Sequence, residues 1–411
     1  MRKDLVYVTL GSALPAISNF VAVVFALRYI DAAWLGRSYA LLALFFVSID
    51  VFNFGSARLY SVEKIRVRFP SLLFLDTVSA TGSALFFSLA ASILSRSGAI
   101  AMPHLLPVLL IAPAGYAMSH FALGYLRLNS GNGAICAVST VSALSRCAVV
   151  WLVATHASRS PYLPDLLLLV EGSYGAMLLG TYLVLRRRPG GVRQGRSSKL
   201  AAYPQLARLG GKELVSSWYS NAIFSGAKHL DVIIAAMLLG PAGAALYRGA
   251  KSVHNLAFNL GQALALVVHS RMREWFLASA KRFSVLALFT LGAAALALLA
   301  IATLCAYKIR LFPTVSLGAP SIQWLFLLLV FTGAALMFAC RITSLMVFSI
   351  SKRSFLILST MEVAGSLALL CVLCVLFGVV GAALAVAVSC GCVLVSSLIF
   401  VKQSFGIRTA R

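Results

Sequence analysis

Four ionisable side chains lie inside two apolar segments of the chain, where a lipid bilayer disfavours charge. They are Lys228 and Asp231 in the first segment, and Arg248 and Lys251 in the second. Each segment is long enough to cross a membrane as a helix, because about 20 apolar residues, each adding about 1.5 Å, span the hydrocarbon. A charge near the middle of such a helix costs at least about 2.5–3.5 kcal/mol. We therefore expect these residues to face a cavity, a partner or a pathway.

Polar residues recur at helical spacing in both segments. The second segment carries Arg248, Lys251, Asn255, Asn259 and Gln262, and the first carries Ser217, Asn221, Ser225, Lys228 and Asp231. Steps of three and four residues place each series on one helix face. We interpret the two polar faces as the lining of a shared water-filled interior, because Arg248 and Lys251 have no acid in their own series. The alternative is polar contact between packed helices, with Lys228 paired to Asp231 within one helix.

Other charged and polar residues in apolar segments extend this predicted interior. Arg146 either points into it or bonds to an acid such as Asp50 or Glu171. For Arg341 the candidate partner is Glu362. A carboxylate at this depth could instead bind a coupling ion. The candidate substrate-binding cations are thus Arg248, Lys251, Lys228, Arg146 and Arg341, the polar lining residues are Asn19, Asn53, Asn221, Asn255, Asn259 and Gln262, and the ion-coupling acids are Asp50, Asp231 and Glu362.

Composition shows which elements must position these residues. Of the 411 residues, 61% are hydrophobic and 11% are charged, and the mean hydropathy is +0.94. This excludes a soluble protein and predicts an all-α, polytopic membrane protein. The length accommodates about 12 spans joined by short connections. We place them near 5–27, 38–61, 72–94, 105–126, 134–156, 165–185, 213–239, 243–268, 285–307, 321–346, 355–378 and 379–401.

The chain divides at its one long connection. Six predicted spans precede a basic linker at residues 189–212, and six follow it. We therefore predict two six-helix lobes, residues 1–188 and 213–411, around a central cavity. A weak internal echo supports two halves, since a Leu-Gly turn lies at the outer end of a helix pair in each half, at Leu35-Gly36 and Leu239-Gly240. Transporters built from repeats place the substrate path between them.

The net charge of +24 is distributed along the chain in a pattern that indicates membrane topology. Lys and Arg gather in alternate connections, which places both termini in the cytoplasm by the positive-inside rule. A nucleic-acid partner is therefore not expected. The eight cysteines lie in or beside apolar runs, and the pair Cys371 and Cys374 has no His or acid cluster nearby. We interpret them as small hydrophobic residues, so no metal site, cofactor or disulfide framework is expected.

Short motifs carry a resemblance to a known superfamily. They are Asp231, Met237-Leu238-Leu239-Gly240, Gly243, Tyr247-Arg248-Gly249-Ala250, Phe377-Gly378-Val379-Val380-Gly381 and Leu35-Gly36-Arg37-Ser38-Tyr39. In these residues and in its helix count, the chain resembles the multidrug/oligosaccharidyl-lipid/polysaccharide exporter superfamily, in particular its Wzx-type polysaccharide flippases. The chain departs from that pattern at residues 158–164, which replace a Gly-rich turn. No thirteenth or fourteenth helix is expected, unlike in the lipid II flippase branch.

The resemblance implies a V-shaped bundle of two lobes that moves polyprenyl-diphosphate-linked oligosaccharides across the bacterial inner membrane by alternating access. The implied partners are that lipid-linked substrate, membrane lipids, and the glycosyltransferases and polymerase of the same surface or exopolysaccharide (O-antigen) pathway. Coupling to a proton or sodium gradient is common in the superfamily. One alternative is a multidrug or organic cation exporter, which would need an acidic cavity. The other is a membrane-embedded polymerase or ligase, which would need catalytic groups in a large outer loop, so no enzyme is expected.

Overall fold

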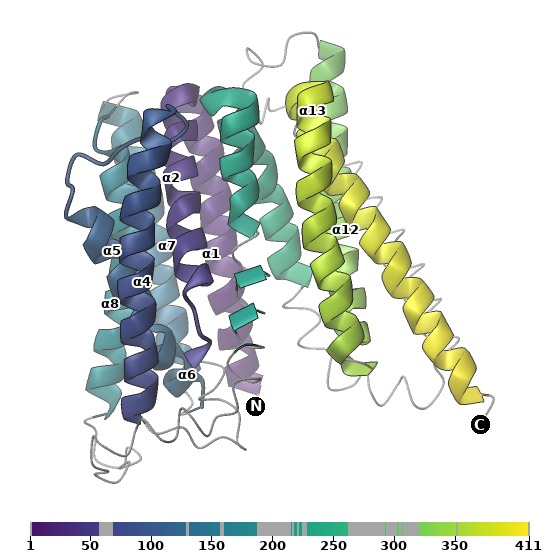
Figure 1. Ribbon diagram of the computed structural model, residues 1–411, viewed down its shortest axis with the longest axis horizontal. Coiled ribbons are helices and arrows are strands. Elements are labelled where there is room, and N and C mark those ends of the chain that lie inside the picture. The colour runs from purple at the N-terminus through teal and green to yellow at the C-terminus, as the bar shows by residue number, and fades with distance from the viewer. Residues whose placement is uncertain are drawn as a thin grey trace. The chain divides into compact units, whose positions relative to one another are not determined.

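The computed structural model describes residues 2–56, 69–128, 131–156, 160–186, 228–261, 320–350 and 352–409, and single residues between 215 and 306. In these ranges the regular structure is helical (Figure 1). Eight of the described helices are long and apolar enough to cross a membrane, and Ala13–Tyr29 is a shorter apolar helix. The predicted all-α, multi-pass membrane fold is therefore confirmed.

The helices follow the predicted spans in order. They are α1 (Arg2–Tyr29), α2 (Ala32–Val51), α4 (Phe69–Arg96), α5 (Val108–Ala117), α6 (His120–Leu128), α7 (Asn132–His156), α8 (Leu163–Arg186), α12 (Pro320–Ile350) and α13 (Lys352–Thr409). The helical segment Lys228–Gly261 lies between α8 and α12 in the chain. The predicted linker 189–212 and nearly all of the predicted span 285–307 lie outside the described residues.

Two glycines turn the chain inside long helical stretches. Gly240, with a φ of 72°, interrupts the segment Lys228–Gly261, and Gly378, with a φ of 60°, interrupts α13. A residue with a Cβ rarely adopts this backbone, so each glycine marks a turn between two helices, as the sequence predicts. At the second turn, a Cβ on Gly381 would lie 1.9 Å from the carbonyl oxygen of Leu373. The two arms of α13 therefore touch beside the turn, and Figure 1 shows them as separate helices.

Helix α4 shows how this protein distributes polarity. Its buried face carries Asp76, Ser79 and Ser83, each at most 1% exposed. Large apolar side chains cover its other face, and those that are 38–64% exposed are Phe74, Val78, Leu85, Phe86, Leu89 and Ile93. A polar interior and an apolar exterior suit a helix whose outer face contacts lipid.

The chain forms two compact units. The first comprises Met1–Ser18 and Arg37–Ile233, and the second comprises Asn19–Gly36 and Ile234–Arg411. The tip of the α1–α2 hairpin therefore belongs to the second unit. The predicted division into lobes at residues 1–188 and 213–411 stays a prediction, because the linker lies outside the described residues.

Glycine allows a very close backbone approach at the hairpin tip. A Cβ on Gly36 would lie 1.7 Å from the carbonyl oxygen of Pro241, which directly follows the turn at Gly240. Real Cβ atoms essentially never come within 3.0 Å of another heavy atom. The two Leu-Gly turns of the predicted internal echo, at Leu35-Gly36 and Leu239-Gly240, are thus neighbours within the second unit.

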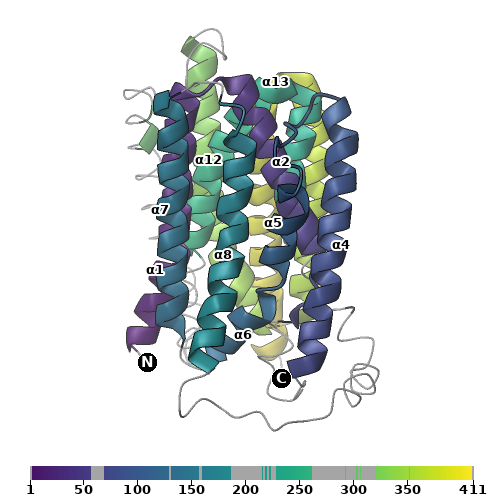
Figure 2. The same ribbon diagram turned by 90° about the vertical axis from the view of Figure 1, so that its left-hand side faces the viewer.

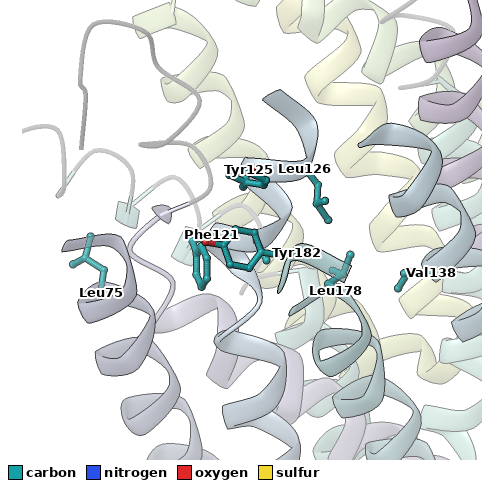
Figure 3. Packing of buried hydrophobic residues seen from close by; sticks show 8 residues of the cluster. Leu75, Phe121, Tyr125, Leu126, Val138, Leu178 and Tyr182 are labelled. Carbon is teal, nitrogen blue, oxygen red and sulfur yellow. The ribbon is translucent and has the colours of Figure 1, made fainter. Parts of the chain in front are cut away.

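An apolar cluster holds the short helix α6 in the first unit (Figure 3). Its buried members come from α4, α6, α7 and α8, and they are Leu75, Phe121, Ala122, Tyr125, Leu126, Val138, Leu178 and Tyr182. The Tyr182 ring meets the rings of Phe121 and Tyr125 edge-on, at centroid distances of 5.0 and 4.9 Å. This geometry is favourable for aromatic pairs. The cluster fixes the beginning of α6, while α5 packs between α4 and α8 (Figure 2).

Candidate functional site

Two predicted binding cations are buried together in the second unit. Arg248 and Lys251 lie one helical turn apart in the segment Lys228–Gly261, and they are 8% and 7% exposed. The Nη2 atom of Arg248 donates a hydrogen bond of 3.3 Å to Oδ1 of Asn19 in α1. The structure therefore brings together Arg248 and Asn19, which the sequence assigned to one polar interior. This partner is a neutral amide.

The next turns of the same helix are held by its own backbone and by α12. Asn259 donates from Nδ2 to the carbonyl oxygen of Asn255 at 2.7 Å, and both side chains are half-buried. The Nε2 atom of the buried His254 lies 2.8 Å from the carbonyl oxygen of Val330. A Cβ on Gly333 would lie 2.8 Å from that nitrogen, so glycine makes room for the ring. His254 thus anchors the helix on α12, close to the two cations.

Arg146 forms an ion pair with Glu171, which links α7 to α8 in the first unit. Both side chains are largely buried, at 15% and 5% exposure. The sequence left open whether Arg146 faces an acid or the interior, and the structure supplies the acid. Its role as a substrate-binding cation stays a prediction. The pair itself is a structural tie whose loss leaves a buried charge uncompensated.

Replacing Glu171 by alanine is expected to lower the free energy of unfolding by about 3–5 kcal/mol, because the guanidinium of Arg146 would remain buried. Replacing both residues by methionine should restore most of this loss, since an apolar pair of similar size needs no charge compensation. Thermal unfolding of the purified protein in detergent measures both effects. Equal instability of the single and double variants would contradict the assigned pairing.

Arg341 contacts an aromatic ring in the second unit. Its guanidinium carbon lies 4.5 Å from the centroid of the Phe258 ring, within the range of a cation–π interaction. It also interacts electrostatically with Glu362, the partner that the sequence suggested. The binding role of Arg341 and the ion-coupling role of Glu362 stay predictions.

Lys228 interacts electrostatically with Asp50 of α2 in the first unit. The side chain of Lys228 is exposed, and that of Asp50 is half-buried. An exposed ammonium group in an apolar span needs water around it, so the surface there is unsuited to lipid contact. Pairing of Lys228 with Asp231 stays a prediction. Asn221 and Gln262, also assigned to the polar lining, lie outside the described residues.

Two spans predicted as continuous are interrupted in the first unit. The predicted span 38–61 is wrong as a continuous helix, because α2 stops at Val51 and residues 53–55 are not helical, whereas residues 57–61 lie outside the described residues. The amide of Gly55, whose φ is 75°, donates to Oδ1 of Asn53 at 2.8 Å, and this local bond replaces helical bonding. The predicted span 105–126 is divided into α5 and α6 by a break at residues 118 and 119.

Residues that the sequence analysis missed lie at the two interruptions or bond to the backbone beside them. Asp76 of α4, only 1% exposed, accepts a hydrogen bond of 2.8 Å from the amide of Phe121. His120, the first residue of α6, lies with Nε2 3.5 Å from Nδ2 of Asn53. Non-helical backbone at membrane depth occurs where it is buried in protein or lines a watery cavity, and in transporters it often forms ion sites. The sequence cue was the run Asn53-Phe54-Gly55-Ser56, which is typical of turns.

The comparisons with known proteins show what fold surrounds these residues. No model of a known protein family matches the chain, and no curated protein matches it. An inward-facing MATE-family multidrug resistance transporter of the MOP superfamily matches with a TM-score of 0.60 and 15% identity, over 97% of this chain and 99% of that chain. The lipid II flippase MurJ, in an inward closed conformation, matches with a TM-score of 0.58 and 15% identity, over 95% of this chain and 87% of that chain.

A third solved structure with this fold concerns the polarity of the binding pocket. A MOP superfamily transporter from Pyrococcus furiosus matches with a TM-score of 0.52 and 12% identity, over 98% of this chain and 96% of that chain. It is described as having a binding pocket of reverse polarity that suggests a different function. Together these matches show that the chain has the fold of MOP superfamily transporters over nearly its whole length.

Proposed function

We propose that this chain, which shares its fold with MATE transporters and with a lipid II flippase, is itself a flippase. Its cargo would be polyprenyl-diphosphate-linked oligosaccharide repeat units for surface or exopolysaccharide. It would carry them across the bacterial inner membrane by alternating access. Both termini would face the cytoplasm, and two six-helix lobes would enclose the path. The glycosyltransferases and polymerase of the same pathway would be its partners.

The burial of Arg248 and Lys251 is the observation that carries this proposal. The helix that follows the turn at Gly240 and reaches residue 261 contains both cations and no Asp or Glu. Two cations at one depth of a membrane span suit a cargo with concentrated negative charge, because charge-assisted hydrogen bonds to phosphate are strong. A diphosphate offers two such groups side by side. Asn19 would hold the guanidinium of Arg248 in place until the phosphate arrives.

The likeness to MurJ supports a lipid-linked cargo, since that protein is described as a lipid II flippase. The Pyrococcus furiosus transporter supports the idea that the charge of the pocket varies with the cargo in this fold. On this view Arg248 and Lys251 provide the positive pocket that a diphosphate requires.

Deletion of the gene in its host tests the function without knowledge of the sugar. We expect surface polysaccharide to be lost and polyprenyl-diphosphate oligosaccharides to accumulate in the membrane, because synthesis continues when export is blocked. Mass spectrometry of extracted lipids and staining of the cell surface measure both, and a plasmid copy should restore them. Unchanged lipids and unchanged polysaccharide in the deletion strain would refute the proposal.

The second candidate function is export of drugs or organic cations, which the likeness to MATE structures favours. The buried acids of the first unit, Asp76 and Glu171, give this alternative some chemistry. Sensitivity of the same deletion strain to cationic dyes decides between them. If the protein is a flippase, its deletion should leave dye resistance unchanged. If it is a drug exporter, its deletion should lower dye resistance and leave the polysaccharide lipids unchanged.

A further inference from the structure

A pair of side chains joins the breaks in the two interrupted spans of the first unit. Asn53 belongs to the non-helical stretch after α2, and His120 begins α6 after the break in the neighbouring span. Their side-chain nitrogens, Nδ2 and Nε2, lie 3.5 Å apart. Nothing in the proposed binding of a diphosphate uses this contact.

Hydrogen-bond polarity fixes the state of the His120 ring. The amide of Gly55 donates to Oδ1 of Asn53, so the orientation of the Asn53 amide is set and its NH2 group faces the histidine. An NH2 group only donates, so Nε2 of His120 must accept. The ring is therefore neutral, with its proton on Nδ1. That Nδ1 atom is buried and has no hydrogen-bond partner within the described part of the chain.

One titratable ring packs against His120, and charged groups lie beyond that ring. Asp76 of α4 bonds to the amide of Phe121, the residue next to His120. The Tyr116 ring of α5 lies 6.1 Å from the His120 ring, edge-on, and Tyr174 of α8 lies beyond it at 5.8 Å. Tyr116 in turn interacts electrostatically with Asp50, Glu171 and Arg146.

A proton on Nε2 would reverse the polarity of the contact. The imidazolium N–H would then face the NH2 group of Asn53, and two donors repel each other. Rotation of the Asn53 amide by about half a turn removes the conflict, because its Oδ1 then accepts from His120. The same rotation takes Oδ1 away from the amide of Gly55. The stretch that ends α2 would thereby lose the bond that shapes it.

We propose that His120 is a proton-binding site, and that its protonation turns the Asn53 amide and reshapes the break after α2. The proton comes from water and returns to water, and no other bond is made or broken covalently. In the flippase proposed above, on which this part rests, it would serve as the coupling ion. Protonation would move the end of α2, which carries Asp50 and Val51. The carbonyl oxygen of Val51 accepts a hydrogen bond of 2.7 Å from the indole N–H of Trp218.

Nitrogen NMR of the full chain, labelled with ¹⁵N-histidine in detergent micelles, tests the protonation state. The chain has six histidines, and the His120 signal is the one lost in His120→Gln. If that variant does not fold, replacing the other five histidines assigns the signal instead. We expect the Nδ1–H form at about pH 8 and protonation of both nitrogens on acidification to about pH 3–4, because burial disfavours the charged ring. An Nε2–H form at high pH, or a ring that stays neutral throughout, would overturn the proposal.

Hydrogen exchange of the peptide containing Gly55 tests the switch. Corrected for intrinsic rates, exchange of this amide should become about tenfold faster on acidification, the effect of losing one hydrogen bond. In Asn53→Asp the acceleration should vanish, because a carboxylate accepts from Gly55 and from a protonated His120 together. The exposed His104 provides the control, since His104→Gln should behave as the natural chain. Acid-independent exchange at Gly55 alongside a titrating His120 would also overturn the proposal.

The NMR and hydrogen-exchange measurements do not depend on transport, so their outcome is independent of the flippase assignment. Deletion data that refute the flippase would leave a proton switch in a transporter of another cargo. A failed switch would leave the diphosphate site of Arg248 and Lys251 untouched.

Discussion

Replacing Arg248 and Lys251 together by glutamine is expected to abolish export while the protein still inserts and folds. Each cation should contribute about 1.5–3 kcal/mol through hydrogen bonds to phosphate. Together this corresponds to a loss of roughly two to four orders of magnitude in affinity for the diphosphate. Insertion should not suffer, because removal of charge from a membrane helix lowers its insertion cost. Restoration of polysaccharide in the deletion strain measures export, and immunoblotting of membranes measures insertion.

The exposed Arg127 in the last turn of α6 supplies the matched control. Arg127→Gln removes one positive charge without touching the buried pair, and export should remain normal. The Arg248→Gln single variant should be intermediate, because Lys251 still offers one phosphate contact. Normal export by the double variant would remove these residues from the binding site.

Replacing Gly36 by alanine is expected to disrupt the second unit severely. The new Cβ would lie 1.7 Å from the carbonyl oxygen of Pro241, and this oxygen belongs to backbone that cannot swing aside as a side chain can. The hairpin tip must move away, which also strains the hydrogen bond from Arg248 to Asn19. Overpacking of this kind costs about 1–3 kcal/mol where neighbours can relax, and more against fixed backbone. We expect a large drop in the midpoint of thermal unfolding and loss of export.

The control for this variant lies in the same unit. Gly365 is inside α13, and a Cβ there would meet nothing within 4 Å. Gly365→Ala should raise stability by up to about 1 kcal/mol, because alanine is the better helix former. Gly36→Ala and Gly365→Ala with equal unfolding midpoints would show that the hairpin tip is not held as described.

Long apolar runs made most of the fold readable from the sequence. Hydropathy located the described helices, and Gly378 marked the turn that divides α13. The errors lie where one local hydrogen bond ends a helix although the hydropathy averaged over the surrounding residues still predicts one. Asn53 ends α2 by binding the amide of Gly55, although the apolar character continues beyond it. Likewise Asp76, far away in sequence, accepts from Phe121 at the beginning of α6, and no pattern within that span reveals it.

The candidate site was readable only in part, for a related reason. Helical spacing shows which residues share a face, so it placed Arg248 and Lys251 together, while their binding role stays a prediction. Spacing within one helix does not show which helix packs against it. The pairing of Arg146 with Glu171 was therefore left as one of two alternatives, and the contact of Arg341 with Phe258 was not anticipated. His120 was overlooked because a lone polar residue among apolar ones forms no pattern.

The abutting tips at Gly36 and Pro241 restrict how this sequence can evolve. A larger side chain at one tip is tolerable only if the other tip yields space. Substitutions in these two stretches, which lie in different halves of the gene, should therefore be coupled during evolution.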